Sequence, residues 1–176
     1  MATHAWEVYK TQGYQIMGGS DGSGEKNDGQ SGAYGWIIIA TKGATKFVLD
    51  RGWGWEDIRA NSARGLIDST RMELAGIAAG ITYAIEKYPE EQMNWYCDNQ
   101  SAVEEVPKLK HRSIREWLAA SNTDISEYLA DLPREKLNNF AVTWKRGHPE
   151  GRKRQDEYTT WAVSYTHLRA HETSID

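Results

Sequence analysis

The chain has 176 residues, of which 39% are hydrophobic and 26% are charged, and its formal net charge is −4. These values are typical of one globular domain and exclude a basic surface over the whole protein, so nucleic-acid binding would need a local patch. A single cysteine, Cys97, excludes an internal disulfide and a multi-thiolate zinc site. The longest apolar run, 36–40, is too short to span a membrane, and no apolar leader opens the sequence, so we expect a soluble, intracellular protein.

Hydrophobic patterns predict an alternation of strands and helices along the chain. Apolar or alternating segments predict strands at 14–17, 33–40, 46–55, 93–98 and 140–144. Apolar side chains repeat at helical spacing over 70–88, and further helices are expected at 101–109 and 122–132. Three successive strands favour an antiparallel meander. The strand and helix units that follow it imply one mixed sheet with helices on its faces.

Two acidic residues in the first half of the chain each allow two interpretations. Asp21 ends the first expected strand and precedes Gly22, so it fits either a turn or a functional site. Glu73 lies three residues after Thr70, a spacing that fits a capping box at the start of the helix. Glu73 also lies at the flank of the apolar stripe, where a modest tilt of the helix would aim its carboxylate over the strand ends.

Two later segments carry further candidates. Asp98 ends a buried strand just before a helix, so Asp98 or Asn99 fits a helix cap. The carboxyl end of a strand beside a helix start is, however, also where open α/β sheets place ligand groups. The segment 144–157 contains His148, several basic residues and Asp156, and it fits a solvated charged loop or part of a site.

Four motifs occur in an order that resembles the ribonuclease H family. They are DGS at 21–23, RMEL at 71–74, CDNQSAV at 97–103 and W-x-x-G-H at 144–148. In their wider context, the motifs read GGSDGS, STRMELAGI and HPEGRK. In this form they are most similar to those of the ribonuclease H domains of retroelement reverse transcriptases. The likeness covers about 14–156. It implies a ribonuclease H-like α/β domain over 1–162, with a five-stranded mixed sheet of three antiparallel and then two parallel strands and helices on both faces.

The resemblance also implies a catalytic metal site. Asp21, Glu73 and Asp98 would hold two Mg²⁺ ions, or Mn²⁺ in their place, because magnesium prefers hard oxygen ligands and leaves positions for water and phosphate oxygens. His148 would help to move protons near the leaving group. Asp156 is the candidate for the family's fourth carboxylate, although the N-x-x-A-D setting of retroelement relatives does not follow it.

The implied substrate is an RNA/DNA hybrid, in which the 2′-hydroxyl marks the strand to be cut. The residues that match substrate-contacting positions of the family are Gly22, Ser23, Thr70, Asn99 and Gln100. Two departures from the family pattern lower the affinity that we expect for the hybrid. Ser69 and Thr70 stand where many cellular members carry an asparagine pair, and the basic segment 108–115 has no room for a long basic protrusion. A fused or associated polymerase could supply the missing affinity.

The expected function is therefore a metal-dependent endonuclease, a ribonuclease H, that hydrolyses the RNA strand of hybrids. The alternative is a non-catalytic ribonuclease H-like module that binds nucleic acid or braces a reverse transcriptase. A related exonuclease is disfavoured because Ser23 stands where its second acid would be. Trp53, Trp55 and Trp117 fit either base stacking or packing. The tail 163–176 resembles a translated adapter sequence and is expected to be non-native or disordered.

Overall fold

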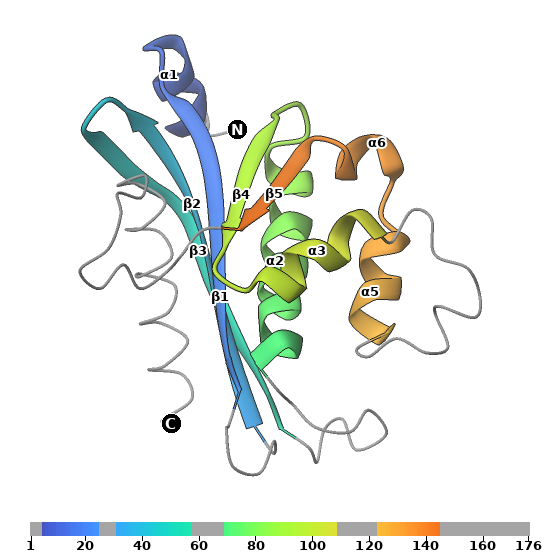
Figure 1. Ribbon diagram of the computed structural model, residues 1–176. Coiled ribbons are helices and arrows are strands. Elements are labelled where there is room, and N and C mark those ends of the chain that lie inside the picture. The colour runs from blue at the N-terminus through green and yellow to red at the C-terminus, as the bar shows by residue number, and fades with distance from the viewer. Residues whose placement is uncertain (1–4, 25–30, 58–68, 109–122, 145–176) are drawn as a thin grey trace.

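The computed structural model describes residues 5–24, 31–57, 69–108 and 123–144 (Figure 1). Its helices are α1 (Ala5–Thr11), α2 (Ser69–Lys87), α3 (Gln100–Lys108), α5 (Thr123–Ala130) and α6 (Arg134–Leu137). Its strands are β1 (Gln15–Gly24), β2 (Ser31–Lys42), β3 (Thr45–Asp57), β4 (Met93–Cys97) and β5 (Phe140–Trp144). His148, Asp156, Trp117 and the tail 163–176 lie outside the described residues. No described helix is both long enough and apolar enough to cross a membrane.

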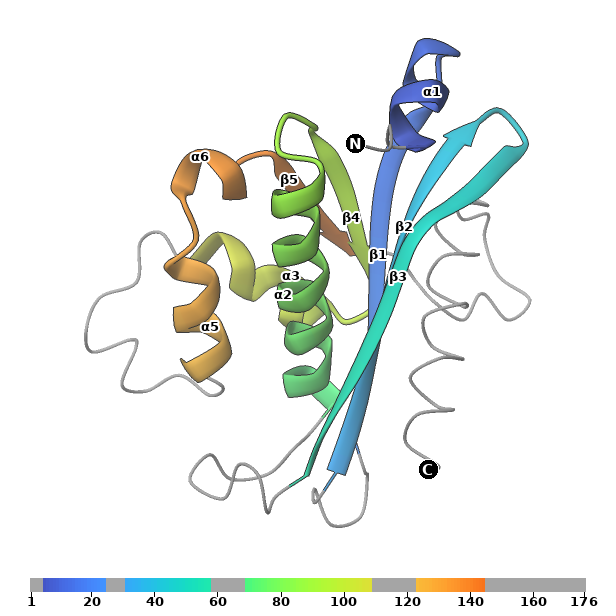
Figure 2. The ribbon, with the colours of Figure 1, turned by 180° about the vertical axis from the view of Figure 1, so that it is seen from behind.

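The five strands form one mixed sheet in the order β3-β2-β1-β4-β5. The first three strands pair antiparallel to one another, whereas β4 pairs parallel to both β1 and β5. This arrangement confirms the predicted fold class. The helices α2, α3 and α5 lie on one face of the sheet (Figures 1 and 2).

The first strand is longer than its sequence predicted. β1 keeps its pairing with β2 through the glycine-rich segment, as far as Gly24 opposite Gly32. Asp21 therefore lies inside β1, opposite Gly35, and not at the end of the strand. The reason is that β2 offers a backbone partner to each residue of this segment, and main-chain pairing overrides the preference of glycine for turns. The turn interpretation of Asp21 is wrong.

Helix α2 packs closely on β1, because glycine stands at the points of contact. A Cβ atom added to Gly22 would lie 2.3 Å from the carbonyl carbon of Met72 and 2.4 Å from the backbone nitrogen of Glu73. The fully buried Trp95 ring fills the space over Gly18 and Gly80, and its Nε1 donates a hydrogen bond of 2.9 Å to Ser20 Oγ. The helix is thereby fixed over β1 and β4.

Strand β2 is buried on both faces of the sheet. Trp36 and Ile38 belong to the core cluster that packs on α2. Because side chains alternate along a strand, Ile37 and Ile39 face the opposite side, and neither is exposed. The helices α2, α3 and α5, which the structure describes, lie on one of these faces, and the expectation of helices on the other face stays a prediction.

One carboxylate, that of Asp50, links the carboxyl-terminal end of α2 to the edge strand β3. Asp50 accepts hydrogen bonds from the Tyr83 hydroxyl at 2.8 Å, from Lys87 Nζ at 2.9 Å and from the Tyr88 hydroxyl. Burial and the hydrogen bond with Asp50 raise the pKa of Tyr88, so this hydroxyl stays protonated and donates. The orientation of α2 is thus held at both ends.

Candidate active site

The register of the two central strands brings Asp21 and Asp98 together. The parallel ladder between β1 and β4 ends with Ser20 opposite Cys97, so the next residue of each chain segment is an aspartate. β4 ends there, while β1 continues. Asp21 is 1% exposed, whereas Asp98 is partly exposed. The pair therefore combines a buried carboxylate with one that solvent reaches, at the carboxyl end of β4.

Helix α2 supplies the third carboxylate, that of Glu73. This residue is 4% exposed, and its Oε2 accepts a hydrogen bond of 3.1 Å from the Cys97 thiol. Ligand atoms of Glu73, Cys97 and Asp98 all lie within 4.8 Å of one another. The helix begins at Ser69, so Thr70 lies inside its first turn. The contacts of Glu73 thus favour the functional interpretation over the capping box.

Burial and the two aspartates act on the pKa of Glu73. Burial raises the pKa of Glu73 well above its usual value, and the charge of Asp21, a hydrogen bond with Asp21 and the charge of Asp98 raise it further. The hydrogen bond from Cys97 acts in the opposite direction. Burial and the charge of Glu73 raise the pKa of Cys97, so the thiol stays protonated and can donate.

The donor set fits a hard divalent cation. Carboxylate oxygens are the ligands that Mg²⁺ and Mn²⁺ prefer, and a protonated thiol is not a ligand for either ion. Buried like charges need a proton or a cation to neutralise them, as the raised pKa of Glu73 indicates. Asp21, Glu73 and Asp98 are thus suited to hold magnesium, with Cys97 orienting one of the ligands.

The residues expected to contact substrate surround this cluster. Gly22 and Ser23 follow Asp21 on β1, and the half-buried Thr70 lies in the first turn of α2. Asn99 Oδ1 accepts a hydrogen bond of 2.9 Å from the backbone nitrogen of Ala102, so Asn99 is the cap of α3. The capping interpretation of Asp98 is therefore not needed. Gln100 is exposed, and its Nε2 donates to Glu104 Oε1 at 3.1 Å.

Two contacts near the site were missed by the sequence interpretation. One is the hydrogen bond from Cys97 to Glu73 described above. The other is a two-pronged ion pair between α2 and α5, in which Arg71 donates to both carboxylate oxygens of Asp124 at 2.8 and 2.7 Å. The Arg71 side chain is only 2% exposed. A buried arginine requires a carboxylate partner, but the burial of Arg71 is a property of the fold, so the sequence offered no signal for this pair.

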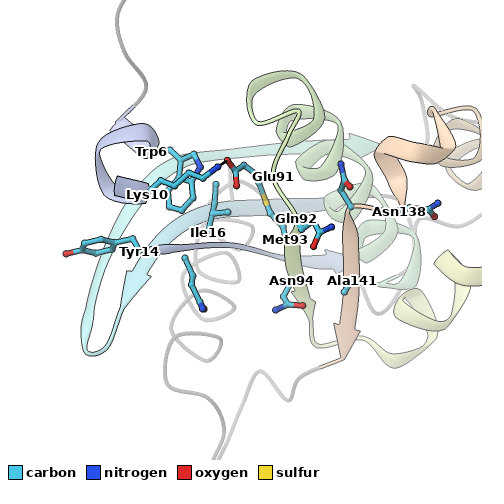
Figure 3. A pocket seen from close by; sticks show the side chains of 12 residues that line it. Trp6, Lys10, Tyr14, Ile16, Glu91, Gln92, Met93, Asn94, Asn138 and Ala141 are labelled. Carbon is cyan, nitrogen blue, oxygen red and sulfur yellow. Dashed lines mark hydrogen bonds and ion pairs between the residues drawn. The ribbon is translucent and has the colours of Figure 1, made fainter. Parts of the chain in front are cut away.

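A polar cleft of about 530 Å³ lies at the opposite end of the sheet (Figure 3). It is lined by α1 and the amino ends of β1, β4 and β5, and Lys10 is paired with Glu91 across it at 2.7 Å. Gln15 lines this cleft and begins the strand that carries Asp21. Asp21 is six residue steps along the strand from Gln15, or roughly 20 Å at about 3.3 Å per step. The cleft is therefore separate from the carboxylate cluster.

Comparisons with known proteins support the fold. No protein-family model matches the chain, and no curated protein matches it. The solution structure of the PFV RNase H domain matches with a TM-score of 0.62 and 15% identity, over 90% of this chain and 93% of that chain. RNase H1 from the halophilic archaeon Halobacterium salinarum NRC-1 matches with a TM-score of 0.52 and 13% identity, over 86% and 93% of the two chains.

A larger protein also contains a similar domain. The prototype foamy virus protease-reverse transcriptase matches with a TM-score of 0.59 and 15% identity, over 90% of this chain and 20% of that chain. The present chain thus spans one fifth of that relative's length. Identities this low establish the fold alone, and the sheet order found here agrees with it. The chain has the ribonuclease H fold and resembles the ribonuclease H family, as its four motifs predicted.

Proposed function

We propose that this protein is a metal-dependent endonuclease that hydrolyses the RNA strand of RNA/DNA hybrids. The observation that carries the proposal is the clustering of Asp21, Glu73 and Asp98 at the carboxyl end of β4. Two of these acids are almost fully buried. Clustered, buried like charges destabilise a fold, so a module with a purely structural role would have little use for them.

The roles of the residues follow from their positions. Asp21, Glu73 and Asp98 would hold two magnesium ions, which when bound supply an activated water and stabilise the departing 3′ oxygen. Cys97 holds the Glu73 carboxylate by its hydrogen bond, and Asp98 is the acid that solvent reaches. We assign proton transfer near the leaving group to His148 and the fourth carboxylate ligand to Asp156, two residues outside the described ranges.

The hydroxyl and amide groups around the cluster are suited to recognise RNA. We assign contacts with the ribose and the bases to Ser23, Thr70, Asn99 and Gln100. We assign to Gly22 a close approach between its own main chain and the RNA. A 2′-hydroxyl both donates and accepts hydrogen bonds, so such side chains can distinguish RNA from DNA. One similar structure is that of the foamy viral protease-reverse transcriptase in complex with an RNA/DNA hybrid. By analogy, we propose a hybrid substrate, an associated polymerase and an intracellular setting for this chain.

A cleavage assay tests the proposal. The protein is incubated with end-labelled hybrid, duplex DNA and duplex RNA, each with magnesium or with a chelator. We expect cleavage of the RNA strand of the hybrid alone, and only with magnesium. Metal-independent binding of hybrid without cleavage would instead indicate a non-catalytic module, and cleavage of duplex DNA would contradict the substrate assignment.

The variant Asp98→Asn tests whether the activity comes from the carboxylate cluster of Asp21, Glu73 and Asp98. Removal of one charge weakens metal binding and relieves repulsion between like charges, so cleavage should be lost while the metal-free protein stays at least as stable. Asp131→Asn is the matched control, because Asp131 is an exposed acid that follows α5. Full activity of Asp98→Asn, or equal loss in the control, would refute the assignment.

A further inference from the structure

The polar cleft at the amino ends of β1, β4 and β5, which we call the α1 cleft, contains a buried hydrogen-bond donor without a partner. Trp6 lines the cleft and is 4% exposed, and among the described residues no group accepts a hydrogen bond from its Nε1. A buried donor that stays unpaired costs free energy, so almost all such groups in folded proteins have a partner. The indole N–H therefore indicates a place for an acceptor that the described residues do not supply.

Carboxamide side chains supply most of the other polar groups of the cleft. Those that make no hydrogen bond in the part of the chain that the structure describes are Gln15, Gln92, Asn94 and Asn139. A carboxamide both donates and accepts hydrogen bonds, as a peptide group does. The charged residues of the lining, Lys10 and Glu91, pair with each other at 2.7 Å, so the lining carries no net charge. The matching ligand is therefore uncharged and carries both donors and acceptors.

Three of these amides stand at one level of three neighbouring parallel strands. Met17 pairs with Asn94, and Asn94 pairs with Ala141. The residues two positions earlier in each segment are Gln15, Gln92 and Asn139. Because neighbouring strands lie about 4.8 Å apart, the three positions span roughly 10 Å, which is the length of about three residues of an extended chain. The cleft volume of about 530 Å³ lies within the range of roughly 300–1,000 Å³ that is usual for small-ligand sites.

The two aromatic rings of the lining are already packed. Trp6 is too buried to offer a ring face, and the Tyr14 ring centroid lies 5.1 Å from that of Tyr9 and 5.9 Å from that of Phe47. Unpaired bases bind proteins mainly by stacking on open rings, and a phosphate needs a cation that is not already paired. The lining therefore disfavours a nucleotide. A peptide main chain, by contrast, presents alternating N–H and C=O groups without charge.

The entrance to the buried donor lies beside the Lys10–Glu91 pair. Figure 3 shows the Trp6 and Lys10 side chains extending from α1 toward Glu91. The Lys10 side chain is 56% exposed, and ion pairs with an exposed member of this kind contribute little to stability. Lys10 can therefore move aside at small cost to admit a carbonyl oxygen to Trp6 Nε1.

We propose that the α1 cleft binds the main chain of a short extended peptide segment of a partner protein, about three residues long and with uncharged side chains. One carbonyl of the segment accepts the hydrogen bond of Trp6 Nε1, and the carboxamides pair with its other peptide groups. Gln15 and Asp21 are roughly 20 Å apart along β1, so the segment leaves the carboxylate cluster open. The proposal goes beyond the proposed function and does not depend on it.

Nuclear magnetic resonance of the full chain tests the proposal. In the ¹⁵N-labelled protein, the indole N–H signal of Trp6 is identified by its loss in Trp6→Phe. The probe is N-acetyl-trialanine N-methylamide, a capped peptide without charge, added at millimolar concentrations. We expect it to shift the Trp6 indole signal and the side-chain amide signals of the cleft until both saturate. Uridine, glucose and sodium phosphate at the same concentrations should shift neither.

Substitutions at exposed positions measure the contribution of the amides. Gln15→Ala/Gln92→Ala removes two carboxamides of the cleft, and both residues are exposed, so the fold should persist. The double variant should raise the Kd of the capped peptide about fivefold or more, the effect of losing two hydrogen bonds. Gln12→Ala is the matched control, because Gln12 is an exposed glutamine directly after α1 that does not line the cleft. It should keep the Kd of the parent.

The proposal is overturned if the capped peptide leaves the Trp6 and cleft amide signals in place, or if the double variant binds it as tightly as the parent does. Equal loss in Gln12→Ala, or tighter binding of uridine, glucose or phosphate than of the peptide, also overturns it. Failure of the proposed function gives a different result, the absence of magnesium-dependent cleavage of any hybrid by the parent.

Discussion

Substitution of Gly22 by alanine tests the contact that joins the two elements carrying Asp21 and Glu73. The added Cβ would lie 2.3 Å from the carbonyl carbon of Met72, about 1.1 Å short of the 3.4 Å at which ordinary contact begins. Its next neighbours are the Glu73 nitrogen at 2.4 Å and the Met72 oxygen at 2.6 Å. All three atoms belong to the backbone, so no side chain can rotate away. β1 and α2 must therefore separate.

The expected cost follows from this overlap. Overpacking of a core costs about 1–3 kcal/mol, and a clash with backbone places Gly22→Ala at the upper end, near 3 kcal/mol. For a chain of this length, that loss lowers the melting temperature by about 6–12 °C. Because the shift moves Glu73 away from Asp21 by about 1 Å, cleavage should fall by roughly a hundredfold even where the protein stays folded.

Thermal unfolding followed by circular dichroism, and hybrid cleavage measured well below the melting temperature, separate these two effects. Gly76→Ala is the control on the same helix, because its Cβ would meet Ser20 Cβ at 3.2 Å, a side-chain contact that needs only a small shift. Alanine also gains about 0.5–1 kcal/mol over glycine inside a helix, so this variant should unfold near the parent's temperature. A Gly22→Ala protein that melts and cleaves like the parent would refute the close packing of α2 on β1.

Three other changes probe the site. Cys97→Ala should raise the magnesium concentration for half-maximal cleavage about tenfold, because a partner that orients a ligand is lost, whereas Cys97→Ser, which keeps a donor, should stay closer to the parent. The raised pKa of Glu73 means that the metal-free folded state binds a proton more tightly than the unfolded state does, so the free energy of unfolding falls as the pH rises above about 4.5. Urea unfolding with a chelator should therefore find Glu73→Gln more stable than the parent at neutral pH but not at pH 4.5. Asp156→Ala should lower magnesium-dependent cleavage severely, while deletion of 163–176 should change it little; equal activity of Asp156→Ala and the parent would leave three carboxylate ligands.

Local patterns were sufficient to predict the five strands and a mixed sheet, because strand and helix periodicities are strong in the segments that form it. The limits of β1 were not predictable in this way. Glycine and serine around Asp21 are typical of turns, and only the pairing with β2 makes the segment a strand. Helix α1 was missed for a similar reason. It has seven residues and one buried side chain, Trp6, so tertiary contacts stabilise it more than its own periodicity does.

The three acids of the candidate site were identifiable in the sequence through the motifs that resemble the ribonuclease H family, because local rules alone left each acid a second interpretation. Their partners were not. Cys97 and Glu73 are 24 residues apart, and Arg71 and Asp124 are 53 apart, so neither contact follows from local spacing. Such contacts depend on how the elements pack, which the close approach of α2 to β1 decides here. The sequence thus indicates the chemistry of the site and the fold supplies its geometry.

The energetics of the carboxylate cluster connect the fold to the proposed function. Asp21 and Glu73 are buried beside each other, and the pKa of Glu73 shows that the metal-free fold resists full ionisation there. The surrounding structure must supply the free energy to keep them together. Trp95 packed between glycines of β1 and α2, the Arg71–Asp124 pair and the hydrogen bonds to Asp50 all hold α2 in place. A cation bound by the acids would relieve the repulsion, so added magnesium should stabilise the parent more than Asp98→Asn, which links metal affinity to folding.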